Sequence, residues 1–322
     1  MWPLIKLLPV QTNFRFVAFA KFAAALSILA AVGSLFFTIY PAKPPCGGLN
    51  CGIDFRGGTV LELSTAPRAL DLGAIRSTMN GMNLGDVQVQ GFGPSAAMVR
   101  FETPVGADAA QVSTQVKERL SQRLGGATFS RTEVVGPKVS GELLRNGLIA
   151  LGLAIGLMLI YIWFRFELQF GLGAVVALFH DVILTFGLIA VTRMEFSLTT
   201  IAAILTIIGY SMNDTVVVFD RLRENLRKYK KMPLREVIDL SINETLSRTI
   251  ITGLTAIMAL TGLAVFGGEA LFGFSVIMIF GIALGTYSSI YVAAPIILLW
   301  GVKRGEEEAA AIKPMGATTY RT

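Results

Sequence analysis

The chain consists of long apolar runs, interrupted once by a long stretch in which apolar and polar residues are mixed. Six of the runs are close to the ~20 residues that a helix needs to cross the core of a bilayer. The mixed stretch lies between the first run and the second. The pattern therefore predicts an α-helical polytopic membrane protein with six transmembrane helices, near residues 18–40, 143–163, 168–191, 198–219, 249–267 and 271–300.

The mixed stretch contains short segments with the periodicities of strands and helices, separated by turns rich in Gly, Asn and Pro. Their order is β-α-β-β-α-β, which is the ferredoxin-like split βαβ arrangement. We therefore expect an α+β ferredoxin-like (βαββαβ) domain between transmembrane helices 1 and 2. It contains no nucleophile–base pair, phosphate-binding loop or histidine, so contact with another protein is its expected task by exclusion. The predicted strands are 59–64, 86–90, 97–102 and 128–135, and the predicted helices are 69–79 and 107–124.

Composition agrees with a membrane protein. The 322 residues are 53% hydrophobic and 16% charged, whereas soluble domains carry about 25% charged residues. The net charge of +6 does not indicate nucleic-acid binding, because most of the excess lies at the expected cytoplasmic ends of helices. The first run is too long for the core of a signal peptide and has no small-residue cleavage site before Tyr40, which indicates an uncleaved anchor.

The charges of the short loops predict the orientation. Arg165 lies in the turn after the second span, and the predicted loop 220–247 carries seven Lys or Arg residues. The loop 267–269 on the opposite side has no basic residue. Both termini are therefore expected in the cytoplasm. The basic run 227–231 favours contact with lipid head groups. The predicted divisions are a cytoplasmic N-terminus with helix 1 (1–40), a periplasmic domain (41–140), helices 2–6 (141–300) and a cytoplasmic tail (301–322).

The chain has two cysteines, Cys46 and Cys51, and both lie in the predicted extracytoplasmic segment. In an oxidising compartment, this spacing favours a small structural disulfide loop. A metal site is disfavoured because two thiols without histidine or further cysteine do not complete a tetrahedral set. Free thiols stay open as an alternative.

Two acidic residues fall inside predicted spans, and such residues are by default candidates for function because a charge in hydrocarbon is costly. Asp181 is near the middle of the third span, next to His180, the only histidine of the chain. Asp214 lies in the inner half of the fourth span, next to Asn213. Burial favours the neutral form of a carboxylic acid, and a nearby cation favours the charged form. The arrangement is therefore suited to carrying protons.

Arg248 is the candidate cation for Asp214, at the cytoplasmic boundary of the fifth span. Helical spacing places Arg248, Thr252 and Thr255 on one polar face. Other interpretations remain open. Asp214 could be a structural acid, and Arg248 could be an anchor that reaches the interface. His180 and Asp181 could pair with each other, cap a neighbouring backbone or line a water pocket. The small-residue pairs Gly152/Gly156 and Gly281/Gly285 are typical of close helix packing.

Five segments carry a family resemblance that covers nearly the whole chain. They resemble the SecF family of bacterial protein-export membrane subunits, which is related to the resistance-nodulation-division superfamily of proton-driven machines. The segments are GIDFRGGT (52–59), VGPKVSGEL (135–143), FRFELQFGLGAVVALFHD (164–181), GYSMNDTVVVFDRLREN (209–225) and LSRTIITGLT (246–255).

The resemblance implies a six-helix subunit of the inner membrane that forms a heterodimer with SecD. It also implies cooperation with the SecYEG channel, SecA and YajC on unfolded preproteins, driven by the proton motive force, without a cofactor. Asp214 and Arg248 take the family's proton-pathway positions. The resemblance also gives the position of His180 and Asp181 among the transmembrane helices, but it assigns them no role. The segment that holds Cys46 and Cys51 departs from the general family pattern.

Two other classes of function are alternatives to this one. An intramembrane aspartyl protease would need both acids at one depth and a GxGD motif, which neither Asp181 nor Asp214 supplies. A proton-driven exporter of small molecules or lipids from the same superfamily is the second alternative, although six spans and one small domain disfavour a self-sufficient pump. The expected role is an accessory subunit of protein translocation with no covalent catalysis.

Overall fold

The computed structural model describes residues 12–42, 45–85, 87–104 and 107–301. These residues form two compact units. The first comprises the described parts of 1–40, 153–194 and 202–322, and the second comprises those of 41–152 together with 195–201. The first eleven residues, the tail 302–322 and Asp86, which begins one predicted strand, lie outside the described residues.

Within the described residues, six helical segments are long and apolar enough to cross a membrane, which confirms the predicted number of spans. The sixth segment is not one regular helix, because α9 passes into a π-helical stretch, η2, and then into α10. The bounds are α1 Ala20–Ile39 (after a 3-10 turn, Phe16–Phe19), α5 Pro137–Arg165, α6 Leu168–Thr192, α7 Leu198–Lys228, α8 Leu234–Phe266, α9 Gly268–Ser288, η2 Ser289–Ala293 and α10 Ala294–Trp300.

The segment 220–247 was predicted as a loop, which is wrong for most of its length. Helix α7 continues to Lys228 and α8 begins at Leu234, so most of this basic segment is helical. Charged pairs stabilise the extension: Arg221 bonds Glu224 one turn later at 2.6 Å and Glu244 on α8 at 2.7 Å. Hydropathy shows only where the residues of a helix become polar. Charged side-chain pairs can stabilise the helix beyond that point, so that it continues into water.

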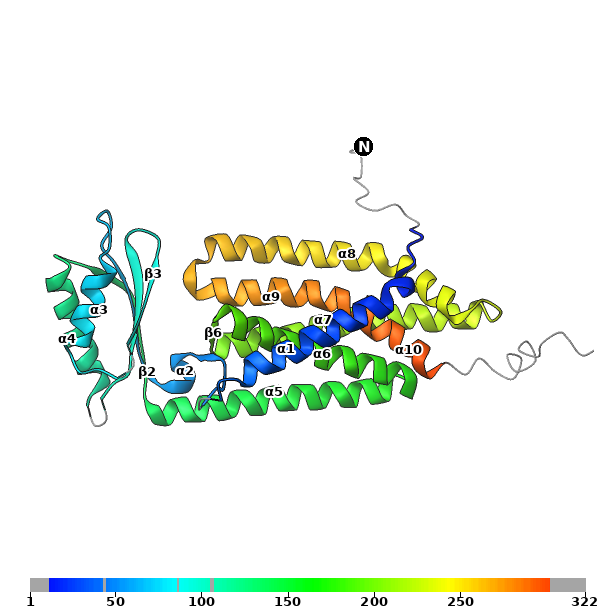
Figure 1. Cartoon of the computed structure of the whole chain (residues 1–322), viewed down its shortest axis with the longest axis horizontal. Helices are drawn as coiled ribbons and strands as arrows, with labels where there is room; N and C mark the ends of the chain where they lie inside the picture. The colour runs from blue at the N-terminus through cyan, green and yellow to red at the C-terminus, as the bar shows by residue number, and fades with distance from the viewer. Residues whose placement is uncertain (1–11, 43–44, 86, 105–106, 302–322) are drawn as a thin grey trace, which may run out of the picture. The chain divides into compact units, whose positions relative to one another are not determined.

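Glycines set how closely α9 packs on α7. A Cβ atom on Gly285 would lie 2.9 Å from the Cβ atom of Ser211, and one on Gly281 would overlap the side chain of Ile207. This confirms close packing at the Gly281/Gly285 pair. Positions 152 and 156 on α5 differ, because a Cβ atom there would meet no atom of the described chain within 4 Å. A partner helix at that face stays a prediction. Helices α8 and α9 run side by side (Figure 1).

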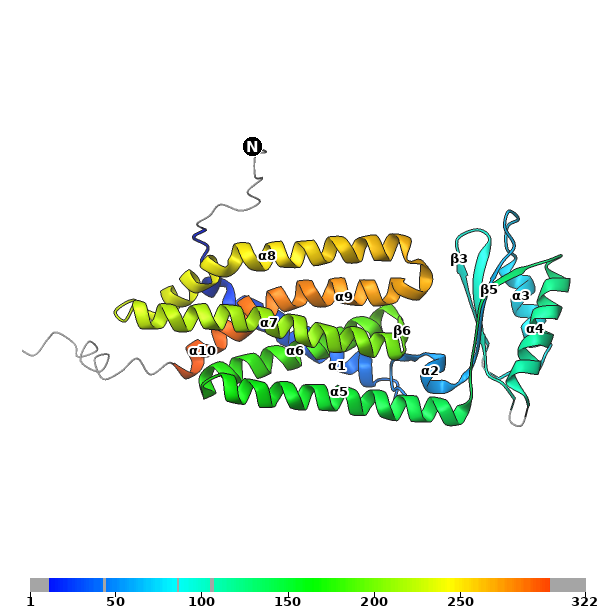
Figure 2. The same cartoon turned by 180° about the vertical axis from the view of Figure 1, so that it is seen from behind.

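The second unit contains a four-stranded antiparallel sheet in the order β3-β4-β2-β5. Helices α3 and α4 cover one face of it (Figure 2), and their apolar residues pack with Leu61, Val99 and Phe101 into one core. Each helix starts at an aspartate, Asp71 or Asp108, whose side chain accepts backbone N–H bonds of the first turn. The elements are β2 Gly58–Ser64, α3 Leu72–Asn80, β3 Val87–Phe92, β4 Ala96–Phe101, α4 Ala109–Arg123 and β5 Thr128–Val135.

The sequence did not predict a small motif in the second unit. Strand β1 (Asn50–Cys51) pairs in parallel with β6 (Glu195–Phe196), and the short helix α2 (Ile53–Arg56) follows β1. A disulfide joins Cys46 to Cys51, whose Cα atoms are 5.9 Å apart. Gly57 and Gly58 then turn the chain into β2 with positive φ angles, and a Cβ atom on Gly58 would lie 2.7 Å from the carbonyl oxygen of Phe101. This close approach requires glycine.

Candidate functional site

Two buried carboxylates lie among the membrane-spanning helices of the first unit. Asp181 on α6 is 1% exposed and Asp214 on α7 is 8% exposed. A buried polar group is costly unless it is hydrogen-bonded, and each of these carboxylates has several hydroxyl partners. The partners come from other helices as well as from α6 and α7.

Asp181 accepts two hydrogen bonds at one oxygen atom. Ser211 Oγ on α7 lies 2.5 Å from Asp181 Oδ2, and Ser288 Oγ on α9 lies 2.7 Å from the same atom. The other oxygen, Oδ1, is 2.9 Å from Nδ1 of His180. Asp181 therefore joins three helices, and its immediate neighbour on the chain is its third partner.

Asp214 has a separate set of partners. Thr249 Oγ1 on α8 donates to Asp214 Oδ1 at 2.6 Å, and Ser289 Oγ donates to Oδ2 at 3.2 Å. Thr215, the next residue on α7, lies 3.4 Å from the Ser289 hydroxyl. Asp214 thus connects α7 with α8 and with the beginning of η2.

Adjacent serines serve the two carboxylates. Ser288 ends α9 and bonds Asp181, whereas Ser289 begins the π-helical stretch and bonds Asp214. Residues in a π-helix are wound differently from those of an α-helix, and short stretches of this kind are frequent at functional sites. Both serines are fully buried. The hydroxyl partners of the two acids are therefore consecutive residues at the junction of α9 and η2.

The contacts of Asp181 continue through His180 and Tyr287 to helix α1. The ring of His180 stacks on Tyr287 at 6.1 Å, and the Tyr287 hydroxyl lies 2.9 Å from Ser27 Oγ and 3.0 Å from the carbonyl oxygen of Ala23. The other ring nitrogen of His180, Nε2, is buried and has no hydrogen-bond partner among the described residues. The predicted neighbours His180 and Asp181 therefore do form a pair.

The cation predicted for Asp214 does not bond it directly. Arg248 is exposed, and among the described residues no ion pair joins it to Asp214. Thr252 donates to the carbonyl oxygens of Arg248 and Thr249 within its own helix. Asn213 is on an exposed side of α7.

Sequence reasoning did not select Thr249, Ser288 or Ser289 as candidate site residues. A threonine next to Arg248 and a serine pair inside an apolar span were visible signals, but three threonines follow Arg248 and only the rotation of α8 decides which of them faces Asp214.

Hydroxyl groups suit carboxylates that change protonation. A serine or threonine hydroxyl donates to a carboxylate, and it can accept from the O–H of a carboxylic acid. The hydroxyl groups around Asp181 and Asp214 can therefore form hydrogen bonds with each acid in its charged and in its protonated form. Within the described residues, no group of three His, Cys, Asp or Glu side chains could hold a metal ion.

Comparison with known proteins assigns this architecture to a family. Residues 115–303 match the family described as "Protein export membrane protein SecD/SecF, C-terminal", and residues 48–67 match the "SecD/SecF GG Motif". A protein translocase subunit SecF from Cereibacter sphaeroides is 47% identical over 316 residues, which cover 94% of each chain. One from Rickettsia bellii is 41% identical, over 94% of this chain and 98% of its own.

Solved structures agree with these relatives. The crystal structure of SecDF from Thermus thermophilus, described as a translocon-associated membrane protein, matches with a TM-score of 0.81 and 32% identity. The match covers 91% of this chain and 39% of that chain, so this chain spans well under half of the SecDF polypeptide. A second SecDF structure, in a super-membrane-facing form, matches with a TM-score of 0.66, 34% identity and coverage of 95% and 41%.

Proposed function

Because this chain belongs to the SecF family of protein translocase subunits, we propose that it is an accessory subunit of Sec protein translocation that uses the proton motive force. The described residues contain six helices that are long and apolar enough to cross a membrane, in agreement with an integral membrane protein. In this proposal the protein lies in the bacterial inner membrane with both termini in the cytoplasm, and it forms a heterodimer with SecD. Its further partners are the SecYEG channel, SecA, YajC, membrane lipids and unfolded preproteins.

The buried carboxylate pair carries the proposal. Asp181 and Asp214 lie on adjacent helices and are bonded by the adjacent residues Ser288 and Ser289. A proton that binds Asp214 removes a buried charge, and moving one charge across the whole membrane is worth about 2.3 kcal/mol per 100 mV of membrane potential. Hydroxyl groups can donate to the carboxylate and accept from the acid, so the partners of Asp214 suit both protonation states. Protonation can therefore change how α7, α8 and α9 pack.

In this proposal the second unit handles polypeptide. Its elements from β2 to β5 follow the order β-α-β-β-α-β, and this order and the sheet order β3-β4-β2-β5 support a ferredoxin-like domain. We place this domain, 41–140, in the periplasm, where it contacts preprotein that emerges from the channel. We assign no covalent catalysis to the protein.

The alternative functions have less support. An aspartyl protease needs two carboxylates that act together on one water molecule, whereas Asp181 and Asp214 are each bonded by their own set of hydroxyl groups. A proton-driven exporter of small molecules or lipids would use the same acids, but the relatives with 41–47% identity are named translocase subunits.

Asp214→Asn tests the proposal. The amide keeps the size of the side chain but cannot titrate, so we expect SecD to co-purify while stimulation of late translocation by the proton motive force is lost. The measurement is preprotein release from spheroplasts or vesicles with and without a protonophore. Asp220→Asn is the matched control: it lies on the same helix and pairs with Arg165 outside the cluster, and it should retain stimulation. Normal stimulation in Asp214→Asn would overturn the proposal.

A further inference from the structure

The first turn of α7, the helix that carries Asp214, is held by residues of the sheet-containing unit. Residues 195–201, which include β6 and this turn, belong to that compact unit, whereas α7 from residue 202 onward belongs to the other. Asp214 lies 16 residues after Leu198 in the same helix, a rise of about 24 Å. One continuous helix therefore has its first turn in one unit and its buried acid in the other.

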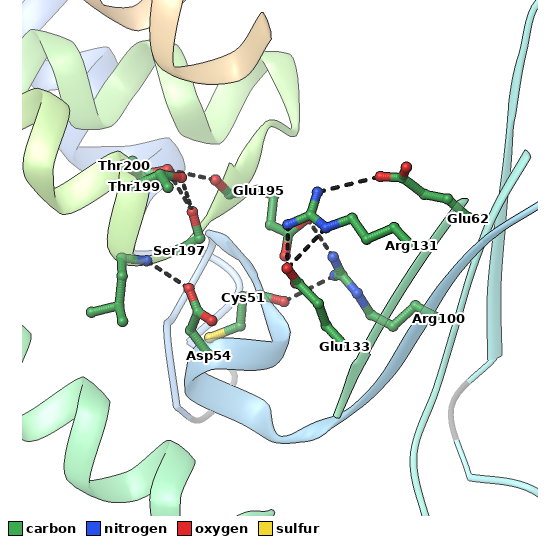
Figure 3. A network of polar contacts seen from close by, with 11 residues as sticks. Cys51, Asp54, Glu62, Arg100, Arg131, Glu133, Glu195, Ser197, Thr199 and Thr200 are labelled. Atoms are coloured by element: carbon green, nitrogen blue, oxygen red, sulfur yellow. Dashed lines mark hydrogen bonds and ion pairs between the residues drawn. The ribbon is translucent and has the colours of Figure 1, made fainter. Parts of the chain in front are cut away.

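The first contact is a helix cap supplied by the GG-motif segment. Asp54 of α2 accepts a hydrogen bond at 2.8 Å from the backbone N–H of Leu198, the first residue of α7 (Figure 3). The N-terminus of a helix presents unpaired N–H groups and a partial positive charge, so a carboxylate stabilises it. The neighbouring Phe55 places its ring 5.2 Å from that of Phe196.

The second contact is an ion pair from the sheet. Arg100 on β4 pairs with Glu195 on β6, and it also donates to the carbonyl oxygen of Cys51 on β1 at 3.3 Å (Figure 3). The Arg100 side chain is 13% exposed and that of Glu195 is 35% exposed, so the pair is partly shielded from water. Arg100 thus joins the four-stranded sheet to both strands of the small parallel pair.

The backbone at Gly52 lies close to both Phe196 and Glu195 of β6. The N–H group of Gly52 donates to the carbonyl oxygen of Phe196 at 2.8 Å. A Cβ atom on Gly52 would lie 2.5 Å from Oε1 of Glu195, so a larger residue would displace the carboxylate that Arg100 binds. The disulfide to Cys46 ties the same strand to the preceding turn.

We propose that Asp54 and the Arg100–Glu195 pair are positioning residues that couple the α+β domain to α7, so that a shift of this helix on protonation of Asp214 is passed to the domain. This inference rests on the proposed proton-driven function. The coupling works through the cap and the ion pair at the first turn of α7. If the cap and the ion pair are weakened, Asp214 can still bind and release a proton, but the shift of α7 is no longer passed to the domain.

Charge reversal tests the ion pair. Arg100→Glu and Glu195→Arg should each lower the stimulation of late translocation by the proton motive force about three- to fivefold, and the double variant should recover most of it. Arg131→Glu is the matched control, because Arg131 pairs with Glu62 and Glu133 within the sheet; it should retain stimulation. Each variant is assayed with SecD co-purified, which separates loss of coupling from loss of assembly.

The cap has its own pair of variants. Asp54→Asn keeps an oxygen that accepts the Leu198 N–H bond and should retain stimulation, whereas Asp54→Ala should lower it about as much as charge reversal. Equal stimulation in the wild type, both single reversals and Asp54→Ala would overturn the coupling alone, provided that Asp214→Asn is defective. A single reversal that the double variant does not rescue would also overturn it. If Asp214→Asn is normal, the proposed function fails first and the coupling falls with it.

Discussion

At the scale of single residues, the neighbours of Asp214 distinguish a group that titrates from one that is fixed in one state. A direct bond with arginine would hold the carboxylate in its charged form. In the structure the groups bonded to Asp214 are the hydroxyls of Thr249 and Ser289, and no ion pair joins it to Arg248 in the part of the chain that the structure describes. Hydroxyl groups serve both protonation states, so this environment favours exchange of a proton.

Thr249→Val should impair the protein although it barely changes the shape of the side chain. Loss of the 2.6 Å bond leaves a buried carboxylate oxygen without its donor, which costs about 1–3 kcal/mol. We expect weaker stimulation by the proton motive force and a lower thermal midpoint in detergent. Thr252→Val is the control: Thr252 is exposed and bonds its own helix, so its effect should stay within about 0.5 kcal/mol. Equal effects of the two variants would contradict this assignment.

The sequence identified both acids but could not select their partners. Asp181 and Asp214 stand out because they interrupt apolar runs. Thr249 and Thr252 look equivalent in the sequence, since both follow Arg248 in an apolar span. Which one faces Asp214 depends on how α8 is rotated about its axis, and packing against α9 and its neighbours sets that rotation.

At the scale of elements, the apolar periodicity predicted the helices and strands well, and it failed where long-range contacts decide. The order of strands and helices between Gly58 and Val135 follows from local patterns. The pairing of β1 with β6 joins residues 50–51 to 195–196, and two-residue strands carry no periodicity. The π-helical stretch Ser289–Ala293 was also missed, because hydropathy is the same for both helix types.

Gly285→Ala should loosen the contact between α9 and α7. The added methyl group would lie 2.9 Å from Ser211 Cβ, and such overpacking typically costs about 1–3 kcal/mol. It would also push the Ser211 hydroxyl away from Asp181 Oδ2. We expect a lower thermal midpoint of the detergent-solubilised protein. Gly273→Ala on the same helix meets nothing within 4 Å and should leave the midpoint unchanged. A midpoint of Gly285→Ala equal to that of Gly273→Ala would show that the contact tolerates an added methyl.

At the scale of the whole molecule, the orientation in the membrane decides whether protons and polypeptide meet this subunit on the sides that the proposal requires. The predicted orientation rests on basic residues near the ends of α7 and α8 and on the long segment between helices α1 and α5, whose length exempts it from the charge rule. The two cysteines of the chain are joined to each other, so an introduced cysteine would be the only free thiol.

Labelling with a membrane-impermeant maleimide therefore tests the orientation against a clean background. Gln122 on α4 and Lys231 between α7 and α8 are both exposed, so a cysteine at either position is accessible to reagent on its own side of the membrane. In intact spheroplasts, Gln122→Cys should be labelled and Lys231→Cys should be protected. Lys231→Cys should become labelled after the membrane is permeabilised, which controls for reactivity. The reverse pattern would place the sheet-containing unit in the cytoplasm, where it could not meet preprotein that emerges from the channel.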